Sequence, residues 1–262
     1  MHKTKIMGIL NVTPDSFSDG GLYVDVDKAV KHATQMVEEG ADIIDVGGES
    51  SRPGSDPISI EEELERVKPV IQRLADEIKV PLSIDTRKPE VAEACIKAGA
   101  SIINDISGLR DPAMAEIAAQ RKASVVIMHM LGTPKTMQQN ISYRDLIGDI
   151  KQFLKEKIQV AKNAGIAKII VDPGIGFGKT AEQNLIIMKR LNEFKIFGCP
   201  LLVGPSRKSF IGTITGLPVH DRIEGTIAAI VISLMNGADI VRVHDVKECK
   251  RAVQIADAVR NA

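Results

Sequence analysis

The feature that most constrains this chain is a series of short apolar runs, rich in β-branched residues, that recurs along its whole length. These runs are IMGIL, DIIDVG, PLSID, SIINDI, SVVIMH, KIIVDP, PLLVG and DIVRVH. Runs that are apolar on both faces are typical of a buried parallel sheet, whose strands need crossover connections, usually helices. The sequence therefore predicts eight parallel strands that alternate with helices.

The segments between these runs carry helix signals. Val30, Ala33 and Val37 fall at i, i+3 and i+7 and form one apolar stripe among charged residues. Further along, Ser59 begins a capping-box sequence, and Pro89 suits the first turn of the next helix.

A near-repeat joins helix to strand. The segments EEGADIIDV, KAGASIIND, NAGIAKIIVD and MNGADIVRV each place a glycine between a helical end and a strand. We expect these glycines to cap their helices in a left-handed conformation; they are Gly40, Gly99, Gly165 and Gly237. Repetition of this joint without an intervening linker favours a closed (β/α)8 TIM barrel, a single domain over residues 1–262, over an open doubly wound sheet. Such a barrel places its active site at the C-terminal ends of the strands.

The charge balance limits the partners of the chain. It has 34 Lys and Arg and 34 Asp and Glu residues, so its formal net charge is zero and no whole-molecule field attracts nucleic acid or an anionic membrane. No apolar run approaches the ~20 residues of a membrane span. Cys95, Cys199 and Cys249 are isolated from one another, which fits a reducing compartment. We expect a soluble, cytoplasmic protein without a nucleic-acid or membrane partner.

Polar residues follow the predicted strands at the expected active-site end. Asp85, Asn104 and Asp172 would offer carboxylate and amide groups around one cavity. A carboxylate that faces adjacent N–H groups makes bidentate, charge-assisted hydrogen bonds, so this set suits a flat heterocycle. A purine, a pterin and a pyrimidine all fit. Helix capping explains any one of these residues but not the whole set.

A second group at the strand ends is cationic. Its members are Arg52, Arg207, Lys208, Arg242 and His244. Ser206 is expected to open a helix, whose free N–H groups would attract an anion as arginine side chains attract phosphate. For Arg207 an outward orientation is an equal alternative, and His129 suits a structural hydrogen bond as well as catalysis.

The glycine-rich segment GIGFG, Gly174 to Gly178, lacks the third glycine of a dinucleotide fingerprint and its Rossmann context. We expect its glycines to allow a ligand to approach closely, with Phe177 as an aromatic wall. No H-x-x-H or carboxylate-cluster motif predicts a built-in transition-metal site. Mg²⁺ stays compatible with the sequence, because one or two protein oxygens and substrate phosphates commonly hold it.

A larger set of motifs resembles a known family over nearly the whole chain. In order, they are MGILNVTPDSFSDGG, DVGGESSRPG, SIDT, INDISG, MHMLGTPKTMQ, DPGIGFGKT, GPSRKSFIG and RVHDV. Their order and spacing are similar to those of the dihydropteroate synthases of the pterin-binding family. The resemblance implies a reaction in which 4-aminobenzoate displaces diphosphate from 6-hydroxymethyl-7,8-dihydropterin diphosphate. It also implies Mg²⁺, a homodimer and a target of sulfonamides.

The resemblance further implies which positions contact each ligand. For the pterin these are Asp85, Asn104, Met128, Asp172 and Lys208, of which Asp85, Asp172 and Lys208 are the catalytic candidates. For the diphosphate they are Asn11, Arg52, Arg242 and His244, with Asn11 also beside the metal. For 4-aminobenzoate they are Ser51, Pro53, Phe177, Ser206, Arg207 and Lys208.

The sequence departs from the family pattern at Ser51, where threonine is usual, and at Pro205, where a small residue is usual. A methyltransferase of the same family is an alternative, but it would not need the diphosphate anchors. A pterin-binding protein without catalytic activity is another. The polar decapeptide NVTPDSFSDG, residues 11–20, is expected to act as a lid that excludes water from a cationic intermediate.

Overall fold

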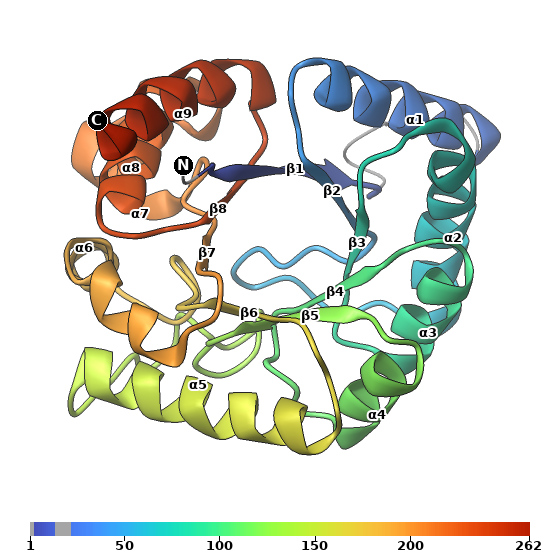
Figure 1. The fold of residues 1–262 in the computed structure, drawn as a ribbon, viewed down its shortest axis with the longest axis horizontal. Helices are drawn as coiled ribbons and strands as arrows, with labels where there is room; N and C mark the ends of the chain where they lie inside the picture. The colour runs from blue at the N-terminus through green and yellow to red at the C-terminus, as the bar shows by residue number, and fades with distance from the viewer. Residues whose placement is uncertain (1–2, 14–21) are drawn as a thin grey trace.

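Parallel hydrogen bonding between neighbouring strands closes a barrel, around which the helices form an outer ring (Figure 1). The computed structural model describes residues 3–13 and 22–262. Within these ranges the strands are β1 (Lys5–Asn11), β2 (Ile43–Gly47), β3 (Leu82–Asp85), β4 (Ile102–Asp105), β5 (Ser124–Met128), β6 (Ile169–Asp172), β7 (Leu202–Val203) and β8 (Ile240–Val243).

The strand order is β6-β5-β4-β3-β2-β1-β8-β7. Val171 of β6 forms a parallel bridge with Leu201, just before β7, and its N–H donates to the carbonyl of Pro200 over 3.0 Å. This contact closes the ring, so the predicted (β/α)8 barrel is confirmed.

Helices connect the strands in the predicted places. They are α1 (Leu22–Glu38), α2 (Ile60–Glu77), α3 (Pro89–Lys97), α4 (Pro112–Gln120), α5 (Leu146–Asn163), α6 (Ala181–Lys189), α7 (Ser209–Thr215), α8 (Ile223–Met235) and α9 (Val246–Asn261), with 3-10 helices η2 (Leu191–Phe197) and η3 (Val219–Asp221). Ser59 caps α2 by accepting the Glu62 N–H over 3.1 Å, and Pro89 starts α3, as predicted.

The glycine joints take the expected conformation. All have positive φ: Gly40 106°, Gly99 124°, Gly165 89° and Gly237 102°. After α1, the Gly40 N–H donates to the Val37 carbonyl and the Ala41 N–H to the Met36 carbonyl, the double bond of a Schellman motif. The same pair of bonds recurs at the other three glycines. The same turn therefore leads each of the four helices into the strand that follows it.

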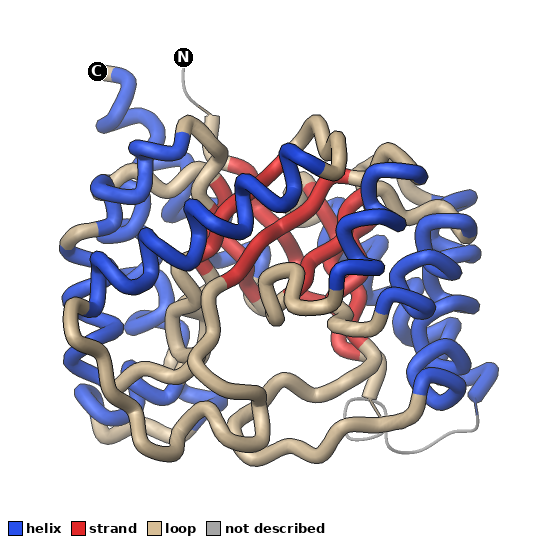
Figure 2. The backbone as a smooth tube through the Cα atoms, turned by 90° about the horizontal axis from the view of Figure 1, so that it is seen from below, coloured by secondary structure: helices blue, strands red, loops and turns tan. Residues whose placement is uncertain are grey.

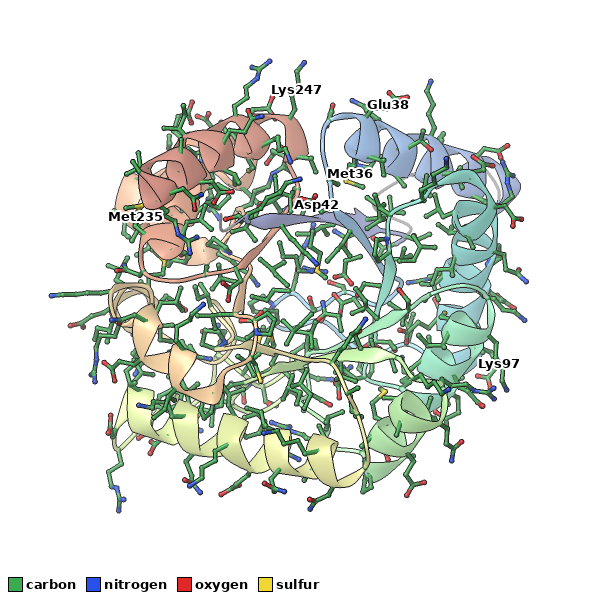
Figure 3. All side chains as sticks on the ribbon, viewed as in Figure 1. Met36, Glu38, Asp42, Lys97, Met235 and Lys247 are labelled. Atoms are coloured by element: carbon green, nitrogen blue, oxygen red, sulfur yellow. The ribbon has the colours of Figure 1, made fainter. Side chains whose placement is uncertain are left out.

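The two faces of the barrel wall differ in polarity. Outward-facing strand residues pack with the helices in the main core, where Met36 faces the strands while Glu38 of the same helix lies at the surface (Figure 3). Inside the barrel, an apolar layer consists of Met7, Ile43, Ile102, Val126, Ile170, Leu202 and Ile240. Two residues further along several strands the inward side chain becomes polar, as at Asp45 and Asn104. This change marks the base of the site.

Long loops gather at the C-terminal end of the strands (Figure 2). The predicted lid falls largely on residues 14–21, which lie outside the described residues. No helix in the described ranges is long and apolar enough to cross a membrane.

Candidate active site

Asp45 organises the polar layer inside the barrel. It is fully buried on β2, and its Oδ2 accepts the amide of Asn104 over 2.9 Å and Nε of Arg242 over 2.6 Å. Its Oδ1 has no hydrogen-bond partner among the described residues. Because Asn104 gives its NH2 group to Asp45, its side-chain oxygen is left as an acceptor for a ligand.

Arg242 also reaches Asp85 at the end of β3, with 2.7 Å between Nη2 and Oδ2. One guanidinium on β8 therefore joins carboxylates of β2 and β3. Burial raises the pKa of Asp85 to about 7, although the nearby Arg242 opposes this effect.

Asp172 lies at the end of β6 and accepts the N–H of Gly174 over 2.7 Å. Burial raises the pKa of Asp172 to about 6, although the Gly174 N–H and the charges of Lys179 and Lys208 act against this shift. The structure thus brings Asp85, Asn104 and Asp172 together at the mouth, as predicted.

Lys208 lies among these carboxylates and against Phe177. Its Nζ is 3.8 Å from the centre of the Phe177 ring, a cation–π contact. Burial lowers the pKa of Lys208 to about 8, and Arg242 adds to the effect while Asp172 and Asp85 oppose it. Phe177 also packs with Met128 in a small apolar cluster at the mouth. Phe177 and Lys208, both expected to contact 4-aminobenzoate, therefore lie side by side.

The helix predicted to open at Ser206 begins instead at Ser209, with Lys208 as its N-cap residue. Arg207 has φ 57°, a left-handed conformation that delays the helix by a turn. Ser206 is buried, and its Oγ lies 3.0 Å from Nδ1 of His244. The placement of Ser206 at the helix start is therefore wrong, and the first turn of α7 begins at Ser209.

Arg207 takes the alternative of pointing away from the polar layer. Its Nε is 3.0 Å from Oδ2 of Asp245, and its Nη2 contacts Oδ1 of the same carboxylate. The Arg207 N–H donates to Oγ1 of Thr226 over 3.0 Å. These bonds fix the turn after β7 against the end of β8.

His129 takes a structural position. Its ring packs edge-on against Phe153 with 5.0 Å between the ring centres, and burial lowers the pKa of His129 to about 2. Lys179, which the sequence did not single out, is buried beside it. Its Nζ lies 3.1 Å from Nδ1 of His129 and 2.9 Å from the Phe177 carbonyl, and burial lowers the pKa of Lys179 to about 7. Lys179 thereby ties the loop after β6 to the end of β5.

The loop between β2 and α2 crosses the mouth toward the loop after β5. The Gly54 N–H donates to the Pro134 carbonyl over 2.9 Å. Arg52 and Pro53 are exposed on this loop and Ser51 is half-buried. Asn11 is half-buried at the end of β1, in register with Gly47.

Asp45 is the main site residue that sequence reasoning missed. It lies within the apolar run DIIDVG, where it resembled part of a buried strand. The available signal was alternation, because Ile43 and Asp45 share the inner face of β2. A carboxylate at that position must meet a partner inside the barrel.

The fold is a (β/α)8 barrel whose mouth gathers acceptor side chains and cations, as in the contact of Arg242 with Asp85. Residues 7–244 match the family described as "Pterin binding enzyme". The chain belongs to the pterin binding enzyme family.

Individual relatives agree with this assignment. The chain is 49% identical to a dihydropteroate synthase of Synechocystis over 98% of its length and 90% of that protein. A Clostridium difficile dihydropteroate synthase structure, obtained in the presence of pteroic acid, is 48% identical with a TM-score of 0.94, covering 99% of this chain and 98% of that one. A Yersinia pestis dihydropteroate synthase with a sulfonamide drug is 47% identical, with a TM-score of 0.94 over 99% and 95% of the chains.

Proposed function

We infer that this chain catalyses the dihydropteroate synthase reaction, in which 4-aminobenzoate displaces diphosphate from 6-hydroxymethyl-7,8-dihydropterin diphosphate. The observation that carries this conclusion is the buried acceptor set of Asp85, Asn104 and Asp172, with Lys208 and Arg242 among them. This set occurs in a chain about half identical, end to end, to dihydropteroate synthases.

The acceptors suit the N–H edge of a pterin. Ionised Asp172 and Asp85 would accept its ring and amino N–H groups, with each charge-assisted bond contributing about 1.5–3 kcal/mol. Asn104 would add a neutral acceptor, because its NH2 group is already engaged by Asp45. A ligand that offers acceptors at these positions would leave the carboxylates unpaired, which favours a pterin edge rich in donors.

The chemical step needs charge stabilisation more than a nucleophilic side chain. The bond between the pterin methylene carbon and the diphosphate oxygen breaks, and its electron pair leaves with the oxygen. Arg52, Arg242 and His244 would stabilise the leaving group, while Asp85 and Asp172 would stabilise the electron-poor methylene. The amine nitrogen of 4-aminobenzoate then forms the new C–N bond and loses a proton. Positioning of the two substrates supplies much of the acceleration.

For 4-aminobenzoate, Phe177 and the stem of Lys208 would enclose the ring, with Ser51 and Pro53 on the opposite loop. Its carboxylate would meet the N-terminal end of α7, which begins at Ser209. Because α7 begins at Ser209, the proposed carboxylate contact lies at that residue and not at Ser206.

Mg²⁺ fits the mouth only as a partly substrate-held ion. Among the described residues no cluster of three His, Cys, Asp or Glu side chains is present to hold a metal. The half-buried Asn11 would supply one amide oxygen, and diphosphate oxygens and water would supply the rest. When bound, the ion would neutralise charge on the diphosphate.

The methyltransferase alternative accounts for the acceptor set but not for cationic groups beside it. A pterin-binding protein without activity would require a damaged aminobenzoate or diphosphate region. The Phe177–Lys208 contact and the Ser206–His244 contact are both intact, which favours the synthase.

The test is diphosphate release by the purified protein. We expect release only when dihydropterin diphosphate, 4-aminobenzoate and Mg²⁺ are supplied together, and a background rate when any one is omitted. A protein that binds the pterin but releases no diphosphate with all three present is not a synthase.

We also propose a cytoplasmic homodimer. Support for the dimer comes from large apolar side chains exposed on neighbouring elements of one sector of the ring, namely Ile214, Leu217, Val219, Ile232, Met235, Ile255 and Val259. Helices α7, α8 and α9 lie side by side there (Figure 1), and Met235 points outward (Figure 3). Sedimentation velocity would contradict the proposal by showing a monomer at micromolar concentration.

A further inference from the structure

Ser206 and His244 form a pair at the mouth that the placement of Ser206 in the aminobenzoate subsite does not explain. The Ser206 Oγ lies 3.0 Å from Nδ1 of His244, and the backbone N–H of His244 donates to the same oxygen over 3.3 Å. The serine is 4% exposed. Its hydroxyl thus contacts one residue twice, once at the backbone and once at the ring.

The direction of the Oγ–Nδ1 bond follows from the available partners. Among the described residues, Nδ1 of His244 is the acceptor within reach of the Ser206 hydroxyl proton. If Nδ1 carried a proton and donated to Oγ, the hydroxyl proton would be buried without an acceptor, which costs about 1–3 kcal/mol. The favoured arrangement has the hydroxyl donating to an unprotonated Nδ1.

The surrounding charges favour a neutral ring. Burial lowers the pKa of His244 to about 3, and Arg242, Arg207 and Lys208 add to this effect while Asp245 opposes it. A neutral imidazole carries one N–H, and the hydrogen bond at one nitrogen decides where that proton lies. With Nδ1 accepting from Ser206, the proton lies on Nε2.

An independent contact holds the two residues in place. Arg207, directly after Ser206, pairs with Asp245, directly after His244, through both oxygens of the carboxylate. The turn and the strand end are therefore already aligned, and the serine hydroxyl is left to orient the ring.

We propose that Ser206 is a positioning residue whose hydroxyl holds His244 in the Nε2–H tautomer, so that the ring offers a hydrogen-bond donor to the diphosphate leaving group. The second half of this proposal rests on the proposed function, whereas the tautomer does not. The opposite tautomer would present a lone pair to phosphate oxygens and weaken their binding.

The tautomer can be read directly by long-range 1H–15N NMR of the wild-type protein, which has five histidines. A spectrum of His244→Gln assigns the His244 ring. We expect an unprotonated Nδ1 and a protonated Nε2 at neutral pH in the absence of ligands. Observation of a protonated Nδ1 in the wild-type protein overturns the proposal, without requiring any activity.

Variants then connect the tautomer to the leaving group. For Ser206→Ala we expect a mixture of tautomers and about tenfold weaker binding of inorganic diphosphate, the loss of about one hydrogen bond. The KM for 4-aminobenzoate should change less than about twofold, and Ser206→Thr, which keeps a hydroxyl, should restore both properties. Ser209→Ala should raise the KM for 4-aminobenzoate and leave the tautomer and the binding of diphosphate nearly unchanged. A Ser206→Ala protein with wild-type tautomer and diphosphate affinity contradicts the proposal.

If the wild-type protein releases no diphosphate in the three-component assay, the proposed function fails while the NMR result still decides the tautomer.

Discussion

Replacement of Asp45 by alanine tests how the site is held together. The buried Asp45 carboxylate accepts hydrogen bonds from Asn104 over 2.9 Å and from Arg242 over 2.6 Å. In the variant, Arg242 keeps only Asp85 as a carboxylate partner among the described residues, and the Asn104 amide loses its acceptor. The buried Asn104 amide and the half-buried Arg242 guanidinium would then have unmet hydrogen-bonding capacity.

The expected loss in the free energy of unfolding follows from these contacts. Removal of one partner from a buried ion pair typically costs about 3–5 kcal/mol. We expect about 3 kcal/mol, the lower end, because Asp85 still pairs with Arg242 and because the unpartnered Oδ1 of Asp45 disappears with the carboxylate. Asp45→Asn keeps one acceptor oxygen, so its loss should be smaller, about 2 kcal/mol.

Reversible urea unfolding at neutral pH, followed by circular dichroism, measures this free energy. Asp76→Ala is the matched control, since Asp76 is exposed on α2 and its loss should change stability by less than about 0.5 kcal/mol. If Asp45→Ala costs less than about 1 kcal/mol, the carboxylate does not organise the polar layer and the reasoning fails.

Three further predictions concern the pocket and its loops. Asp172→Ala should weaken pterin binding about 100-fold or more in calorimetric titration, because the proposed bidentate charge-assisted contact would be lost, and unchanged affinity would refute the assignment. In the proposed mechanism the carboxylate form of Asp85 accepts the pterin N–H, and burial raises the pKa of Asp85 to about 7, so kcat/KM for the pterin substrate should rise with pH through about 7. In Asp85→Asn, kcat/KM should no longer rise with pH through about 7. A wild-type kcat/KM that does not change with pH would count against the role of Asp85. Gly174→Ala should destabilise by more than about 2 kcal/mol, because φ is 74° and the new Cβ would lie 1.9 Å from the His129 carbonyl oxygen. Gly165→Ala, with φ 89° and open space, should cost only about 1 kcal/mol, and equal melting temperatures for the two variants would contradict this account.

The fold was predictable because its local signals agree with one another. The apolar runs, the helix stripes and the glycine joints all indicate the same alternation, and each joint forms the same pair of backbone bonds. Strand ends of a parallel barrel meet at one mouth, so the gathering of Asp85, Asn104 and Asp172 followed from topology.

The details that could not be predicted from the sequence depend on contacts between distant segments. The segment SRKS offers two serines that suit a helix start, and only the left-handed Arg207, paired with Asp245, decides for the second. Lys179 resembles a surface lysine until the loop after β6 packs it beside His129 at the end of β5. In both cases the decisive partner lies far along the chain.

The most direct test of the central claim is the identity of the product. Purified protein would be incubated with dihydropterin diphosphate, Mg²⁺ and 4-aminobenzoate labelled with 15N at the amine, and the product analysed by mass spectrometry beside a diphosphate assay. We predict 7,8-dihydropteroate that retains the label, formed in equal amount to diphosphate by the wild-type protein and lost in Asp172→Ala. Diphosphate released without labelled dihydropteroate, or no product at all, would contradict the account.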